Sequence, residues 1–152
     1  MTTFMTTRPD PETNERPHAL AHATFIISGE SVDPAFWTSY FGVRPSSIIV
    51  KGEPYLYPSG KLSKHPGKIG FWSFESSGEV HTDQLEPHLR WLVEALKLPR
   101  AELRELITES RAKMFFWCYW ANYTGDRIPD VPDDIQAMMV SLGGTIEIDE
   151  YR

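Results

Sequence analysis

One apolar stretch dominates the sequence: KMFFWCYWANY at residues 113–123. Its centre, from Met114 to Trp120, is seven apolar residues of which five are aromatic, and it is too short to cross a bilayer. Aromatic side chains suit the pleated surface of a sheet, so the stretch predicts a central β-strand. Alternation separates its side chains into two sets, Met114, Phe116, Cys118 and Trp120 against Phe115, Trp117, Tyr119 and Ala121. Both faces of the strand therefore need cover.

Four other segments have the composition of strands, namely residues 24–28, 47–50, 69–75 and 145–151. With the helical patterns between them, the order along the chain is βαββααβαβ. This order predicts an α+β fold, a two-layer sandwich with helices packed mainly on one face of a mixed five-stranded sheet. The second face is then left open. Trp117 and Tyr119 lie on that open face, or Phe116 and Trp120 if the strand has the opposite register.

Start and stop signals delimit the expected helices. Asp33-Pro34 is an N-cap residue followed by proline in the first turn, and Gly42 supplies the left-handed residue that ends this helix. Asp83 and Glu86 have the spacing of a capping box at the start of a leucine-rich helix. Pro99 is expected to start the next helix.

Length and composition indicate a single domain. A chain of 152 residues with 41% hydrophobic residues can bury one core, so residues 23–152 are expected to form one domain behind a disordered leader, residues 1–22. A formal net charge of −6 argues against general binding of nucleic acid or anionic membranes. Without a secretory signal or a membrane-length apolar run, we expect a cytoplasmic protein. The single cysteine, Cys118, predicts a buried apolar side chain.

Acidic residues are concentrated in the segment 126–152, which holds seven of them against two arginines. Aromatic anchors beside an acidic rim suit docking onto a basic protein surface, where the acids guide encounter and the rings supply affinity. The alternative is a solvated acidic face beside an ordinary core strand. On the first interpretation the partner-binding residues are Asp126, Asp130, Asp133, Asp134, Glu147, Asp149, Trp117 and Tyr119.

The loop at residues 52–70 supports a second hypothesis, because it is the basic patch of an acidic chain. An anionic small molecule, bound or turned over in a cleft between this loop and the sheet edge, would contact Lys61, His65, Lys68 and His81. No nucleophile with a nearby base is evident, so no catalytic residue is assigned and an enzyme ranks second. No metal site or cofactor is expected. A homodimer that pairs the open sheet faces is a third possibility.

Several short motifs occur in an order typical of one known family. They are Ser28-Gly29-Glu30 with Asp33-Pro34, Phe41-Gly42-Val43-Arg44-Pro45, Gly52-Glu53, Gly70-Phe71-Trp72-Ser73, and Leu142-Gly143 with Ile146, Asp149 and Tyr151. Over residues 24–151 the chain resembles the bacterial family known as domain of unknown function 4279. That resemblance implies a small cytoplasmic protein similar to the immunity proteins found beside secreted toxins, and it carries over no catalytic residue. The leading hypothesis is therefore a non-enzymatic protein-binding module that neutralises a cognate toxin.

Overall fold

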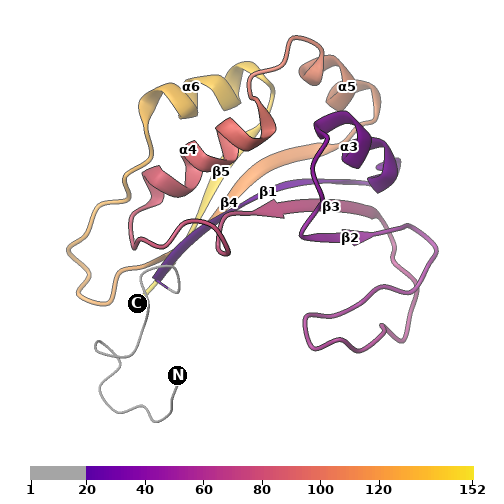
Figure 1. Cartoon of the computed structure of the whole chain (residues 1–152), viewed down its shortest axis with the longest axis horizontal. Coiled ribbons are helices and arrows are strands. Elements are labelled where there is room, and N and C mark those ends of the chain that lie inside the picture. Colours follow the sequence, from indigo (N-terminus) through magenta and orange to yellow (C-terminus); the bar gives the residue numbers. More distant parts are fainter. Residues whose placement is uncertain (1–19) are drawn as a thin grey trace.

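A computed structural model describes residues 20–152 and shows, within that range, a five-stranded sheet and four helices (Figure 1). The strands are β1 (Ala21–Gly29), β2 (Ser47–Ile49), β3 (Gly70–Glu75), β4 (Lys113–Ala121) and β5 (Thr145–Tyr151). The helices are α3 (Pro34–Phe41), α4 (Leu85–Leu96), α5 (Leu103–Glu109) and α6 (Asp133–Ser141). All four helices lie on the same side of the sheet, which confirms the predicted two-layer α+β fold. None of the helices in this range is long and apolar enough to cross a membrane.

The sheet is mixed, with the strand order β2-β3-β1-β4-β5. β3 and β4 both pair antiparallel with the central β1, and β2 pairs antiparallel with β3. β5 pairs parallel with β4, and α6 forms the crossover between them. The connection from β1 through α3 to β2 spans two strand positions in the sheet, because β3 lies between these two strands. The predicted central strand therefore lies beside β1, one place from the sheet edge.

The core lies between the sheet and the helices. Phe25 and Ile27 of β1, Trp72 of β3, and Phe116 and Trp120 of β4 are all fully buried. They meet the leucine stripe of α4, whose Leu85, Leu89, Leu92 and Leu96 are likewise fully buried. Phe116 and Trp120 therefore point into the core. Of the two registers left open by the sequence, the structure has the one that puts Trp117 and Tyr119 on the open face. Cys118 is also fully buried, and burial raises the pKa of its thiol to about 12.

The first helix begins and ends as predicted. The Asp33 side chain accepts a hydrogen bond from the Ala35 amide, and Gly42 ends α3 in the left-handed conformation with φ of 68°. Gly143 likewise has a positive φ of 83° just after α6. These local signals were sufficient because both partners of each cap are close in sequence.

Apart from one-residue shifts in β2 and β3, three boundaries differ from the sequence predictions. β1 begins at Ala21, so Ala21 and His22 belong to the sheet and not to the leader, because they pair with Trp120 and Tyr119 of the long β4. The rest of the predicted leader, residues 1–19, lies outside the described residues. Asp83 does not cap α4, whose N-cap is Gln84. Pro99 precedes α5 by a turn and does not start it, since that helix begins at Leu103.

Candidate protein-binding face

The face of the sheet opposite the helices is called the open face here. No helix or strand of residues 20–152 lies against it (Figure 1). Strand register places neighbouring side chains on it in rows: Trp117 lies between Thr24 of β1 and Glu147 of β5, and Tyr119 lies between His22 and Asp149. Trp117 and Tyr119 are half-buried. The structure thus brings together four of the predicted partner-binding residues, Trp117, Tyr119, Glu147 and Asp149.

Aromatic rings form a continuous series along this face. His22 stacks on Tyr119 with ring centroids 5.2 Å apart, and it also contacts Trp117 at 5.8 Å. Tyr119 in turn lies 5.9 Å from Tyr151, and Tyr151 lies 6.0 Å from Tyr123. Such contacts between rings limit rotamer freedom. The rings therefore lose little side-chain entropy when a partner binds.

Carboxylates border the aromatic series on both sides. Glu147 and Asp149 flank it on β5, and Glu75 of β3 lies across β1 in the same row as Trp117. Lys113 contacts Glu147 at 3.4 Å, and both side chains are well exposed. Asp149 is exposed and has no ion pair within residues 20–152. The net charge of this border is negative.

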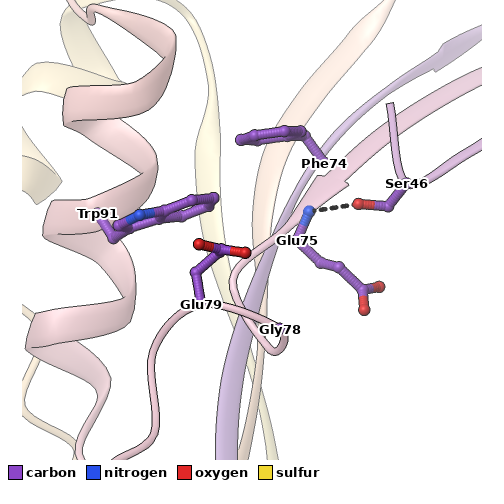
Figure 2. Close-up of a pocket in the computed structure, with 6 residues that line it drawn as sticks. All are labelled: Ser46, Phe74, Glu75, Gly78, Glu79 and Trp91. Atoms are coloured by element: carbon purple, nitrogen blue, oxygen red, sulfur yellow. Dashed lines mark hydrogen bonds between the residues drawn. The ribbon is translucent and has the colours of Figure 1, made fainter. Parts of the chain in front are cut away.

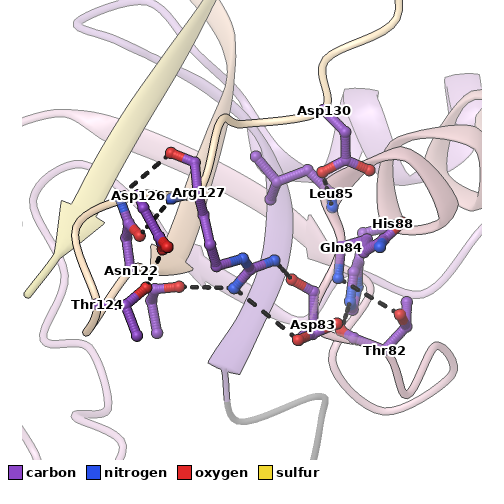
Figure 3. A network of polar contacts seen from close by, with 11 residues as sticks. Thr82, Asp83, Gln84, Leu85, His88, Asn122, Thr124, Asp126, Arg127 and Asp130 are labelled. Atoms are coloured by element: carbon purple, nitrogen blue, oxygen red, sulfur yellow. Dashed lines mark hydrogen bonds and ion pairs between the residues drawn. The ribbon is translucent and has the colours of Figure 1, made fainter.

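The remaining predicted acids lie elsewhere: Asp126 and Asp130 are in the loop after β4 (Figure 3), and Asp133 and Asp134 are in the first turn of α6. Both carboxylate oxygens of Asp130 accept backbone hydrogen bonds at the start of α4, from Leu85 at 2.8 Å and Glu86 at 2.9 Å. Asp126 accepts a short hydrogen bond from Thr124. Asp133 is exposed in the first turn of α6. These contacts give Asp130 a capping role and separate it from the open face.

Asp134 is held by a bidentate contact. Nη1 and Nη2 of Arg90 donate to its two carboxylate oxygens at 2.9 Å and 3.0 Å, and Nε of the same guanidinium donates to Glu86 at 3.0 Å. Hydrogen bonding to Arg90 lowers the pKa of Asp134 below its usual range. The pair joins α4 to α6 on an exposed surface, where ion pairs contribute little to stability.

Arg127 anchors the loop that carries Asp126 and Asp130 (Figure 3). Its guanidinium donates to the carbonyl oxygens of Ala121 at 2.7 Å and Asp83 at 2.5 Å, and it lies 4.9 Å from the centre of the Trp120 ring. Asp83 is thus bound by the arginine through its backbone, while Asp130 supplies the cap of α4. Of the two loop acids, Asp130 therefore has a structural role at the start of α4.

The alternative basic site is not assembled as one cleft. Lys61, His65 and Lys68 are exposed on the loop between β2 and β3, which projects beyond the edge of the sheet (Figure 1). His81 belongs to the segment that leaves the other end of β3. A pocket does open near that end, but none of these four residues lines it. Nothing in the geometry favours the loop hypothesis.

A serine and a histidine do approach each other inside the domain. Ser76 Oγ lies 2.6 Å from Nδ1 of His88, and Nε2 of His88 lies 2.9 Å from the carbonyl oxygen of Thr82. Because a carbonyl can only accept, Nε2 carries a hydrogen. Ser76 Oγ also accepts from the Ala23 amide at 3.0 Å, and both side chains are fully buried. The pair joins β1 to α4 and is inaccessible to a substrate.

Two residues of the open face, His22 and Glu75, were not predicted from sequence. The sequence prediction places His22 in the leader, although Ala21, Ala23, Phe25 and Ile27 alternate with the polar residues His22, Thr24 and Ser28, a usable strand signal that only Ile26 interrupts. Glu75 comes from a strand far from the acidic segment, so only the sheet order places it in the same row as Trp117.

Comparisons with known proteins give one match. No curated protein and no solved structure matches the chain. Residues 18–152 match the family described as Domain of unknown function (DUF4279), and this range includes the whole sheet and all four helices described above. Because the match covers nearly the whole chain, the protein belongs to the DUF4279 family.

Proposed function

We propose that the chain is a protein-binding module and that its open face docks onto a basic protein surface. One observation carries the proposal: Trp117 is a half-buried aromatic side chain in the middle of a sheet face bordered by Glu147 and Asp149. Large rings at the centre of a face are the usual source of affinity in protein interfaces. Charged groups at the border mainly raise the rate and the selectivity of association.

The charge distribution favours a basic partner. The central row holds two carboxylates, Glu75 and Glu147, on either side of Trp117, and Asp149 extends the border beside Tyr119. A second copy of the chain would bring the same carboxylates against each other, which opposes pairing of two open faces. In a partner rich in lysine and arginine, the positive charges would pair with the carboxylates. The aliphatic parts of the same side chains would pack on the rings, and their cations could stack on the ring faces.

We further propose that the partner is a toxin and that the module is its immunity protein. An immunity protein can neutralise a toxin by covering the toxin's active site. This needs a docking face of the kind described, and it needs no catalytic residues in the immunity protein. A toxin that acts on nucleic acid has a basic active site, and the carboxylates of the open face would complement it.

Co-expression tests this proposal. The products of the reading frames next to the gene are expressed alone, with the wild-type chain, and with the double variant Glu147→Lys/Asp149→Lys. We expect one neighbour to be toxic alone, harmless with the wild type, and toxic again with the variant. The matched control is Glu105→Lys/Glu109→Lys, which makes the same change of charge at exposed positions of α5, in the helical layer. Equal protection by both double variants would exclude the acidic border of the open face from the function.

A further inference from the structure

A pocket opens beside the end of β3 (Figure 2). Its volume is about 380 Å³, and its lining comes from the chain before β2, the end of β3, the turn that follows and one residue of α4. The lining residues are Ser46, Phe74, Glu75, Gly78, Glu79 and Trp91. None of them belongs to the sequence-predicted sites.

The pocket exists because β2 is short. The pairing of β2 with β3 stops at Ser47 and Ser73, so Phe74 and Glu75 are paired with β1 on one side and have no strand on the β2 side. Only the Ser46 hydroxyl continues the edge, by accepting a hydrogen bond from the Glu75 amide at 2.9 Å. The turn after β3 contains Gly78, where an added Cβ would meet no heavy atom within 4 Å. The space between this edge and α4 is therefore left open.

Flat aromatic surface and a carboxylate meet in this space. The rings of Phe74 and Trp91 are nearly parallel, at an interplanar angle of 11° with centroids 5.4 Å apart, and both side chains are half-buried. In Figure 2 the Glu79 carboxylate lies next to the Trp91 ring, whereas the Glu75 carboxylate points away from both rings. Within residues 20–152, Glu79 has no ion pair with a basic side chain.

We propose that this pocket binds a guanidinium group, that of an arginine side chain displayed by another polypeptide. A planar cation can stack on the face of an indole while its N–H groups donate to a carboxylate, and Trp91 and Glu79 offer these two surfaces side by side. A lysine ammonium could satisfy the carboxylate but has no planar surface to stack, so it binds more weakly here.

The lining also distinguishes a side chain from free arginine. Free arginine carries an α-carboxylate, and none of the six lining residues is basic. The pocket therefore offers the α-carboxylate no ion-pair partner, although the α-ammonium of the same zwitterion balances its charge. An arginine within a polypeptide has neither backbone charge, so it loses no hydration of a carboxylate that the pocket cannot pair.

The site goes beyond the proposed function, because its rings belong to the helical side of the sheet and not to the open face. Glu75 is common to the two surfaces, since it lines the pocket and also shares the strand row of Trp117. A partner on the open face could reach the pocket, but binding of a guanidinium does not require such a partner. A negative result for guanidinium binding would not affect the proposal of docking through the open face, and the converse also holds.

Titration of the full chain with N-acetyl-arginine-N-methylamide, followed by two-dimensional NMR, tests the inference. We expect saturable shifts of the Trp91 indole N–H and the Gly78 amide, with a dissociation constant on the order of 1 mM, typical of a ligand with so few atoms. The corresponding citrulline derivative has the same shape without the charge and should bind at least about fivefold more weakly. Glu79→Gln should weaken binding of the arginine derivative by a similar factor. Glu105→Gln, which removes the same charge from α5, should leave it unchanged.

Two results would overturn the proposal. Equal affinity for the arginine and citrulline derivatives, or equal affinity of the wild type and Glu79→Gln, would show that the pocket does not recognise a guanidinium. Tighter binding of free arginine than of the blocked derivative would assign the pocket to a free amino acid and not to a side chain. Thermal unfolding of each variant establishes that the fold is intact.

Discussion

His22 of β1 stacks on Tyr119 of β4, with ring centroids 5.2 Å apart and ring planes inclined by 16°. This contact begins the series of rings on the open face and joins the first residues of β1 to β4. It also places the aromatic surface next to Asp149, the register partner of Tyr119 on β5. Rings and carboxylates thus occur together because of strand register, and the binding proposal depends on this combination.

Truncation of two neighbouring residues of β4 should lower stability by different amounts. Phe116 is fully buried in the core, and Phe116→Ala should lower the free energy of unfolding by about 3–5 kcal/mol. Trp117 lies on the open face, and Trp117→Ala should cost less than about 2 kcal/mol, because part of its surface is still exposed in the folded chain and would be covered only on binding. Urea unfolding measures both values. A larger loss for Trp117→Ala than for Phe116→Ala would contradict the assignment of the faces.

Asp130 should matter for stability and not for binding. Asp130→Ala removes a carboxylate that accepts two backbone hydrogen bonds at the start of α4, and should lower the free energy of unfolding by about 1–2 kcal/mol. Asp149→Ala removes an exposed carboxylate without an ion pair in the described residues, and should change stability by less than about 0.5 kcal/mol. Thermal or urea unfolding of the two variants makes the comparison. Equal stability losses would show that the Asp130 cap contributes nothing.

The Cys118 thiol should be unreactive in the folded chain. Burial raises its pKa from 9.0 to about 12, so the nucleophilic thiolate is nearly absent near neutral pH. Labelling with a maleimide at pH 8 should be at least about 100-fold slower in buffer than in 6 M urea, since reaction requires opening of the core. Rapid labelling of the native protein would show that the face of β4 carrying Cys118 is accessible.

The same pKa shift predicts a pH dependence of stability. Between about pH 9 and about pH 12 the thiol ionises in the unfolded chain but remains protonated in the folded one. The unfolded state then binds fewer protons, so this group makes stability fall as pH rises, by up to about 1.4 kcal/mol per pH unit. The effect fades as the pH falls below about 9, where the thiol is increasingly protonated in both states. Unfolding measured from pH 8 to pH 10.5 should show a steeper fall for the wild type than for Cys118→Ala, and parallel curves would contradict the shift.

Local patterns predicted the elements well, for reasons visible in particular residues. Asp33-Pro34 and Gly42 delimit α3 through contacts within a few positions, so the motif contained all the information needed. Alternation within 113–121 separated Phe116 from Trp117, but the sequence left open which of the two faces the helices cover. The leucine stripe of α4 settles that in the structure by packing on the Phe116 side.

Long-range contacts account for what the sequence did not show. Asp83 and Glu86 had the spacing of a capping box, yet the cap comes from Asp130, 45 residues from Leu85. The acidic segment was treated as one cluster because its residues are close in sequence. In the fold, Asp130 and Asp134 bind α4, while Glu147 and Asp149 point to the open face. The pocket of Trp91 and Glu79 has no sequence signal at all, since its lining comes from separate elements.

The salt dependence of association between the chain and the toxin proposed as its partner tests the central claim most directly. Rate constants for the wild type are measured by surface binding from about 20 mM to about 500 mM salt, and compared with Glu147→Lys/Asp149→Lys and the control Glu105→Lys/Glu109→Lys. We predict association of the wild type to slow steeply with salt, and the open-face variant to associate at least about tenfold more slowly at low salt, with a flattened dependence. The control should follow the wild type. Identical rates and slopes for the two double variants would contradict docking through the open face.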